Sequence, residues 1–85
     1  MVSLEQTVEL MLSEDYKERF QAEVYQLQQR ILKLENLIDK YNNGELDFKP
    51  DTPIIILKNQ LNHMHNYWDI LMIRATIENI PLKLS

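Results

Sequence analysis

Residues 13–41 read SEDYKERFQAEVYQLQQRILKLENLIDKY, and this stretch decides the fold of the 85-residue chain. Apolar residues recur in it at alternating steps of four and three, which is the spacing of one edge of a helix. They are Phe20, Val24, Leu27, Ile31, Leu34, Ile38 and Tyr41. Because no glycine or proline interrupts residues 13–43, we predict one helix about 40 Å long, whose apolar edge needs a partner.

The second half of the chain offers that partner. Its apolar residues advance by the same steps: Leu57, Leu61, Met64, Trp68, Leu71 and Ala75. Two stripes of equal period, joined by a short loop, predict an all-α fold, an antiparallel hairpin of two long helices in a single domain. The predicted parts are a short N-terminal helix at 1–12, long helices at 13–43 and 53–80, and a loop at 44–52.

The predicted helix ends rest on local signals. Ser3 with Gln6 three residues on is the pattern of a capping box, and Ser13 reads as the N-cap of the first long helix, after a bend near 12–14. Thr52 is the predicted cap of the second long helix, with Pro53 at its first position.

The remaining segments are read as connections. Gly44 ends the first long helix, Pro81 stops the second, and Leu46 and Phe48 are expected to tuck the loop back onto the helices. The tail 82–85 either lies on the bundle or frays.

The second long helix carries more apolar surface than the first helix can cover. Further apolar or aromatic residues surround its stripe: Ile54, Ile55, Ile56, His63, Tyr67, Ile70, Met72, Ile73 and Ile77. A leftover patch of this kind marks an interface, so we predict a homo-oligomer. The alternative is a monomer in which the N-terminal helix and the tail cover the patch.

Composition narrows the classes of function. The net charge is −4, which disfavours a DNA-binding protein, because DNA binding needs a basic stripe against the phosphates. With no cysteine, disulfides and thiolate metal sites are excluded, and an intracellular setting fits best. No apolar run approaches the roughly 20 residues that cross a bilayer, so no membrane association is expected.

Residue types suited to catalysis are poorly placed. The only histidines, His63 and His65, point about 200° apart on a helix, so one metal cannot join them, and a contact of His65 with Asp69 is better read as a surface pair. A single glycine excludes a glycine-rich phosphate loop. We therefore expect no enzyme, no metal and no cofactor.

Polar residues suited to binding remain on both long helices. They are Tyr16, Arg19, Tyr25, Arg30 and Lys33 on the first and His63, Tyr67 and Arg74 on the second. Cations can hold phosphates while Tyr16, Phe20 or Tyr25 stacks on a base, as recognition of a small nucleotide requires. From spacing alone, ordinary salt bridges such as Glu23–Arg30 and amphipathic tyrosines at an interface are the favoured explanation of these residues.

A family resemblance rests on two runs. They are EDYKERFQAEVYQLQQRILKLENLIDKY and, after a loop ending in proline, LKNQLNHMHNYWDILMIRATIENI. Together these runs, over roughly residues 13–80, resemble the small phage helical-hairpin proteins that sequester cyclic oligonucleotide messengers and so counter CBASS immunity. The resemblance implies a homo-oligomer, commonly a hexamer, in the cytoplasm of the infected bacterium, that binds cyclic dinucleotides or trinucleotides without cleaving them.

The resemblance also assigns roles to residues. It implies that Tyr16 stacks on a base, with Phe20 in that role if the register shifts by one turn, and that Arg19, Arg30 and Lys33 face phosphates. Arg74 would line a separate pocket that suits cyclic trinucleotides. A structural or adaptor hairpin, which binds a partner protein through its spare apolar face and binds no nucleotide, is the alternative function.

Overall fold

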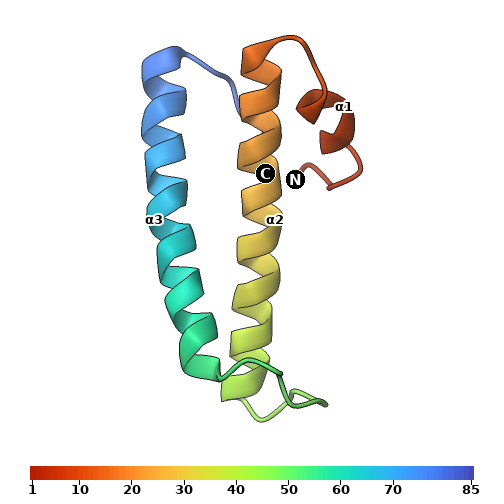
Figure 1. The fold of residues 1–85 in the computed structure, drawn as a ribbon, viewed down its shortest axis with the longest axis vertical. Helices are drawn as coiled ribbons and strands as arrows, with labels where there is room; N and C mark the ends of the chain where they lie inside the picture. The colour runs from red at the N-terminus through yellow and green to blue at the C-terminus, as the bar shows by residue number, and fades with distance from the viewer.

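The computed structural model describes residues 1–85 as three helices without strands (Figure 1). Helix α1 spans Thr7–Met11, α2 spans Tyr16–Asn42 and α3 spans Ile54–Glu78. Helices α2 and α3 lie antiparallel, and the molecule is elongated, 43 × 24 × 21 Å. The all-α hairpin predicted from the two stripes is confirmed.

The core follows the apolar edge of α2. Phe20, Val24, Leu27 and Ile31 are buried there and pack with Leu71 and Ala75 of α3. Further along, Leu34 is only half-buried and Tyr41 is exposed, and on α3 the predicted stripe residues Leu57, Leu61, Met64 and Trp68 are half-buried. The tightest packing therefore lies where α2 begins and α3 ends.

Two of the predicted N-caps are wrong. Helix α2 begins at Tyr16, and Asp15 caps it, because its carboxylate accepts a hydrogen bond from the Lys17 N–H at 2.9 Å. The Ser13 hydroxyl instead accepts from the Asp15 N–H at 3.0 Å and so shapes the turn between α1 and α2. Helix α3 starts at Ile54 behind Pro53, and no side chain caps it, so Thr52 does not serve as its cap.

The N-terminal segment keeps its capping box but forms a shorter helix than predicted. The Ser3 N–H donates to Gln6 Oε1 at 2.9 Å, and the Gln6 N–H donates to Ser3 Oγ at 3.3 Å. Residues 4–6 form a turn, so helix begins only at Thr7. In the loop, Leu46 is half-buried, whereas Phe48 is exposed and does not tuck back as predicted.

The end of α3 returns the chain onto α2. Asn79 adopts the left-handed conformation, and the N–H groups of Asn79 and Ile80 donate to the carbonyls of Thr76 and Ala75, which is a Schellman-type ending. Ile80 is buried beside Ala75, and Pro81 leads the chain away from the helix axis. Of the two alternatives for the tail, the structure shows the one in which it lies on the bundle.

Side-chain amides of α2 hold both terminal segments. Gln21 donates to the Pro81 carbonyl at 2.8 Å and Gln28 to the Leu84 carbonyl at 2.9 Å, while the Tyr25 hydroxyl accepts from the Lys83 N–H at 2.9 Å. On the N-terminal side, Gln29 donates to the Val2 carbonyl at 2.8 Å and Gln26 to the Thr7 hydroxyl at 3.0 Å. The first half of α2 is thus covered on three sides, by α3, by α1 and by the tail.

The outer face of α3 remains uncovered. Both α1 and the tail pack on α2, and α1 makes no contact with α3. The exposed fractions of the isoleucines on this face run from 52% to 72%: Ile55, Ile56, Ile70, Ile73 and Ile77. The alternative in which the N-terminal helix and the tail cover the patch is therefore wrong.

Candidate ligand-binding face

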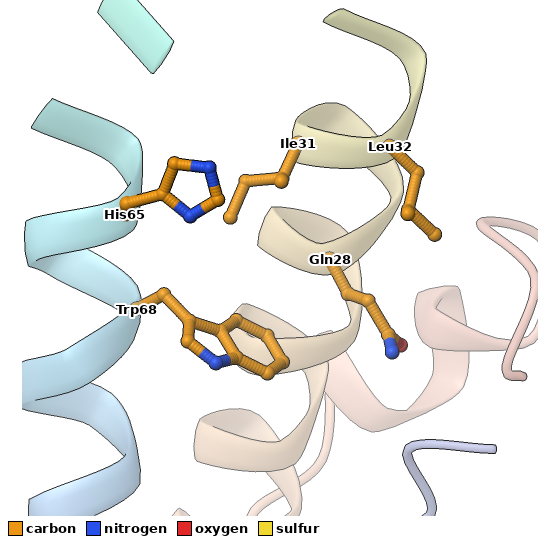
Figure 2. A pocket seen from close by; sticks show the side chains of 5 residues that line it. All are labelled: Gln28, Ile31, Leu32, His65 and Trp68. Carbon is orange, nitrogen blue, oxygen red and sulfur yellow. The ribbon is translucent and has the colours of Figure 1, made fainter. Parts of the chain in front are cut away.

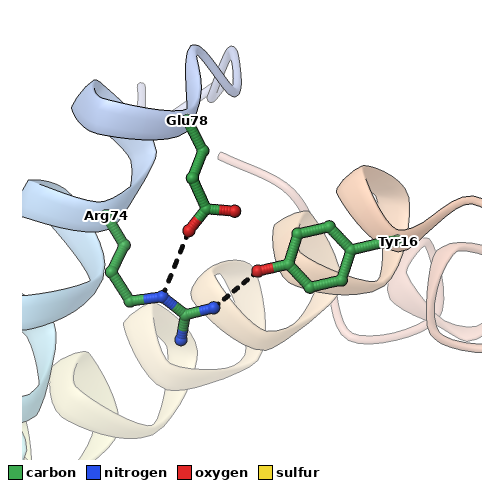
Figure 3. A network of polar contacts seen from close by, with 3 residues as sticks. All are labelled: Tyr16, Arg74 and Glu78. Carbon is green, nitrogen blue, oxygen red and sulfur yellow. Dashed lines mark hydrogen bonds and ion pairs between the residues drawn. The ribbon is translucent and has the colours of Figure 1, made fainter.

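Three of the predicted site residues, Tyr16, Phe20 and Arg74, meet where α2 begins and α3 ends. Figure 3 shows two of them, Tyr16 and Arg74, together with Glu78. The Arg74 Nη2 group donates to the Tyr16 hydroxyl at 2.6 Å, and Arg74 Nε lies 3.4 Å from Glu78 Oε2. The guanidinium carbon also lies 4.9 Å from the centroid of the Phe20 ring, within cation–π range. Arg74 therefore bridges the two long helices.

The surroundings of Arg74 favour its cationic form. The pKa of Arg74 is raised, first because the Tyr16 hydroxyl accepts its hydrogen bond and then because Glu78 faces it. Since a guanidinium is always protonated near neutrality, the contacts fix its orientation and not its charge. Two of its five N–H groups are used by these side chains, and the others are available to an anion.

The two aromatic residues of this cluster have different roles. The Tyr16 side chain is 46% exposed, whereas Phe20 is 2% exposed and forms part of the core. Their ring centroids are 6.4 Å apart with the rings tilted by 44°, so Tyr16 rests on the edge of the core. Tyr16 offers a ring face to a ligand, and Phe20, the alternative stacking residue, does not.

The Arg19 guanidinium is engaged elsewhere. Its Nη1 group donates to the Ser13 carbonyl at 2.8 Å, so this side chain closes the turn between α1 and α2. Arg19 is exposed, and eleven residues separate it from Arg30, an interval that returns α2 to within about 20° of the same face. Its guanidinium is held at the turn, however, and Arg19 does not line the groove at Arg30 and Lys33.

Arg30 and Lys33 line a groove between α2 and α3. The groove has a volume of about 300 Å³, and the other residues along it are Leu34, Leu37, Gln60 and Met64. Both cations are exposed, and neither takes part in a salt bridge, so the Glu23–Arg30 ion pair is not formed. Two free cations beside an apolar groove floor suit an anionic ligand with an apolar body.

The groove and the Arg74 cluster lie on one face of the hairpin. Arg30 follows Tyr16 by fourteen residues and Arg74 follows Gln60 by fourteen, and such intervals return a helix to nearly the same face after roughly 21 Å. Arg74 bonds to Tyr16 at one end of this surface, and Gln60 lies beside Arg30 at the other end. The antiparallel register between α2 and α3 is therefore the same at both ends. We call the surface that Tyr16, Arg30, Lys33, Gln60 and Arg74 share the basic face.

Tyr67 stands in the middle of the basic face. It follows Gln60 by seven residues and precedes Arg74 by seven, and its side chain is 41% exposed. In the same register it lies across from Glu23, which is half-buried on α2. The face therefore has cations at both ends and an aromatic ring between them.

The groove residues Gln60 and Met64 were not predicted as site residues, although a sequence signal for Gln60 exists. Gln60, Tyr67 and Arg74 form a strict heptad, which runs beside the core stripe of α3. Met64 belongs to the predicted core stripe and reaches the groove only because that stripe is half-buried. Neither residue differs in type from ordinary helix-surface and core residues, so residue type alone gives no reason to select them.

The histidines and acids form no metal site. No group of three or more histidine, cysteine, aspartate or glutamate side chains gathers in the structure. His65 lies 3.7 Å from Glu35 on α2, and the pair with Asp69 that the sequence allows is not formed. Helix pairing brings in a carboxylate from the other helix, which spacing along α3 alone cannot reveal.

Comparison with protein families matches residues 14–77, well over half of the chain, to the Sequestin family. The chain belongs to the Sequestin family. The match agrees with the resemblance to sequestering proteins seen in the sequence. Comparisons with curated proteins and with solved structures find no match.

The matched range covers the two long helices and leaves out both terminal segments. It contains α2 and all of α3 except its last residue, and with them every residue of the basic face. Helix α1 and the tail lie outside it. The matched range is thus the hairpin, and the two segments outside it are those that cover α2. None of its helices is long and apolar enough to cross a membrane.

Proposed function

We propose that this Sequestin-family protein is a phage-encoded, non-enzymatic protein that binds cyclic dinucleotides or trinucleotides and withholds them from CBASS immunity in the host cytoplasm. The observation that carries the proposal is the basic face, where Arg30 and Lys33 are unpaired beside a groove and Arg74 is oriented by Tyr16. Phosphates bind to the cations, and bases stack on the exposed rings of Tyr16 and Tyr67.

The proposal assigns the two ends of the basic face to different contacts. Arg30 and Lys33 hold phosphates of a cyclic dinucleotide in the groove, where Leu34, Leu37 and Met64 contact its apolar atoms. Arg74 serves larger ligands such as cyclic trinucleotides, in a pocket where several protomers meet. Glu78 pairs with Arg74 Nε, so a phosphate would bind to the N–H groups of the guanidinium that Glu78 and Tyr16 leave free.

The proposal includes a homo-oligomer built through the outer face of α3, a hexamer being the assembly that the resemblance implies. The accessible surface of the chain is 6081 Å². A compact monomer of this mass exposes roughly 5,300 Å². The excess, on the order of 800 Å², reflects the elongated shape of the hairpin, and the exposed isoleucines of α3 supply the apolar character that an interface needs.

Isothermal titration against a panel of cyclic dinucleotides and trinucleotides tests the proposal. We expect saturable binding, which Arg30→Ala and Lys33→Ala each weaken roughly tenfold, because each removes a charge-assisted contact. Lys58→Ala is the matched control, since Lys58 is an exposed lysine that does not line the groove. Ligand recovered after the protein is denatured should be intact; recovery of linear products would refute sequestration without cleavage.

The adaptor hairpin is the second candidate, and the uncovered isoleucine face of α3 is the observation that favours it. It predicts no heat with any cyclic nucleotide while the assembly stays intact by light scattering. That pair of results would replace the nucleotide proposal with the adaptor.

A further inference from the structure

A second pocket lies between α2 and α3, away from the basic face (Figure 2). Its volume is about 190 Å³, and it is lined by Gln28, Ile31 and Leu32 of α2 and by His65 and Trp68 of α3. Gln28 and Arg30 are two residues apart and therefore point about 200° away from each other around α2. The pocket and the groove at Arg30 open on opposite sides of the hairpin.

The walls of this pocket are suited to a flat ring. Trp68 and His65 are one turn apart on α3, and Figure 2 shows the indole and the imidazole both projecting toward α2 and facing the same space. Ile31 is buried at the back, and the exposed Leu32 stands at the rim on α2. Aromatic side chains of α3 and aliphatic side chains of α2 line the two sides of this pocket. The pocket therefore suits a planar ligand whose faces are apolar.

The polar groups of the pocket are suited to the edge of such a ring. His65 Nε2 points toward Glu35 at 3.7 Å, and the other ring nitrogen of His65 faces Trp68 across the pocket. Gln28 donates its amide N–H to the Leu84 carbonyl, and its Oε1 is the buried side-chain oxygen that has no hydrogen-bond partner.

The volume restricts the ligand to one ring system. Pockets that enclose a whole drug-sized ligand measure about 300–1,000 Å³, and this one is smaller. A nucleobase has these properties: its ring faces stack on an indole, and its hydrogen-bond donors and acceptors are confined to the ring edge. We propose that the pocket between Trp68 and His65 binds a single nucleobase, separately from the phosphate contacts of the basic face.

Trp68 is the only tryptophan of the chain, so its fluorescence reports on this pocket alone. We propose titrating the protein with free nucleosides, which carry the base without any phosphate, and exciting the indole at its red edge. Saturable quenching of Trp68 is expected. His65→Ala should weaken the apparent affinity by roughly threefold to tenfold, because it removes one hydrogen bond and one wall of the pocket.

The control is His63→Ala, since His63 is an exposed histidine on α3 that does not line the pocket. It should leave the titration unchanged. The proposal is overturned if quenching is linear and equal to that of free N-acetyltryptophanamide, or if both histidine variants behave alike. A Trp68 emission shift that depends only on protein concentration would show instead that a second copy fills the pocket.

The nucleobase pocket rests on the proposed function, because a cyclic nucleotide would supply the base. The pocket proposal and the sequestration proposal can nevertheless be refuted separately. Nucleosides that quench Trp68 while no cyclic nucleotide binds would remove the sequestration proposal and keep the pocket. Calorimetric binding of a cyclic nucleotide without a response of Trp68 to nucleosides would do the reverse.

Discussion

Replacing Tyr25 by phenylalanine tests whether the tail is part of the folded core. The Tyr25 side chain is 3% exposed, and its hydroxyl accepts from the Lys83 N–H at 2.9 Å. The substitution removes one oxygen and leaves a partly buried N–H without a partner, which costs about 1–1.5 kcal/mol. For a domain of this size, each kcal/mol corresponds to about 4–8 °C in the midpoint of thermal unfolding.

The assay is thermal unfolding by circular dichroism at a fixed protein concentration. Tyr41→Phe is the matched control, because Tyr41 is exposed and its hydroxyl makes no hydrogen bond within the chain. Amide hydrogen exchange gives a second readout, in which Lys83 should lose its protection in Tyr25→Phe. If Tyr25→Phe and Tyr41→Phe unfold within about 0.3 kcal/mol of each other, the tail does not contribute as described.

Other predictions follow from burial and exposure. Leu71→Ala should destabilise the fold by about 3–4 kcal/mol in urea unfolding, because this side chain is 0% exposed, and a loss below about 1 kcal/mol would contradict the packing described. Ile70→Asp should reduce the assembly size measured by light scattering, whereas the exposed α2 variant Asn36→Asp should not. Arg74→Ala should weaken cyclic trinucleotide binding roughly tenfold in calorimetry and leave dinucleotides nearly unchanged; an equal effect from Arg19→Ala would refute the distinction.

Sequence periodicity predicts the hairpin because burial of one helix edge repeats every three to four residues. The apolar edge from Phe20 to Ile38 therefore appears directly in the sequence. The exact start of α2 does not, since Ser13 and Asp15 are both good caps, and the choice between them depends on the turn that joins α1.

The contacts of the glutamines depend on tertiary structure. In the run Gln26-Leu27-Gln28-Gln29, the three amides look like a solvated surface, but each holds part of a terminal segment far away in sequence. Gln28 and Gln29 satisfy backbone carbonyls of non-helical terminal residues, Leu84 and Val2, while Gln26 donates to the Thr7 hydroxyl of α1. No period in the sequence reports such a contact.

For the candidate site, the residue types were predictable and their grouping was not. Tyr16, Arg30, Lys33 and Arg74 stand out as exposed aromatic or basic residues, but only the register of α2 against α3 pairs Arg74 with Tyr16 and Arg30 with Gln60. The Arg19 guanidinium is engaged by the turn between α1 and α2, a contact that the sequence does not reveal.

The unequal cover of α2 gives the hairpin a gradient of local stability along its length. Near Tyr25, three neighbours must separate before the backbone hydrogen bonds of α2 open, whereas beyond Ile31 only α3 must move. Opening therefore starts at the interhelical loop and spreads toward the termini. Arg30 and Lys33 lie between the part of α2 that has three neighbours and the part that has only α3. A ligand that joins these two cations to Gln60 would therefore hold α2 and α3 together, and it would slow amide exchange most at the loop end of the hairpin.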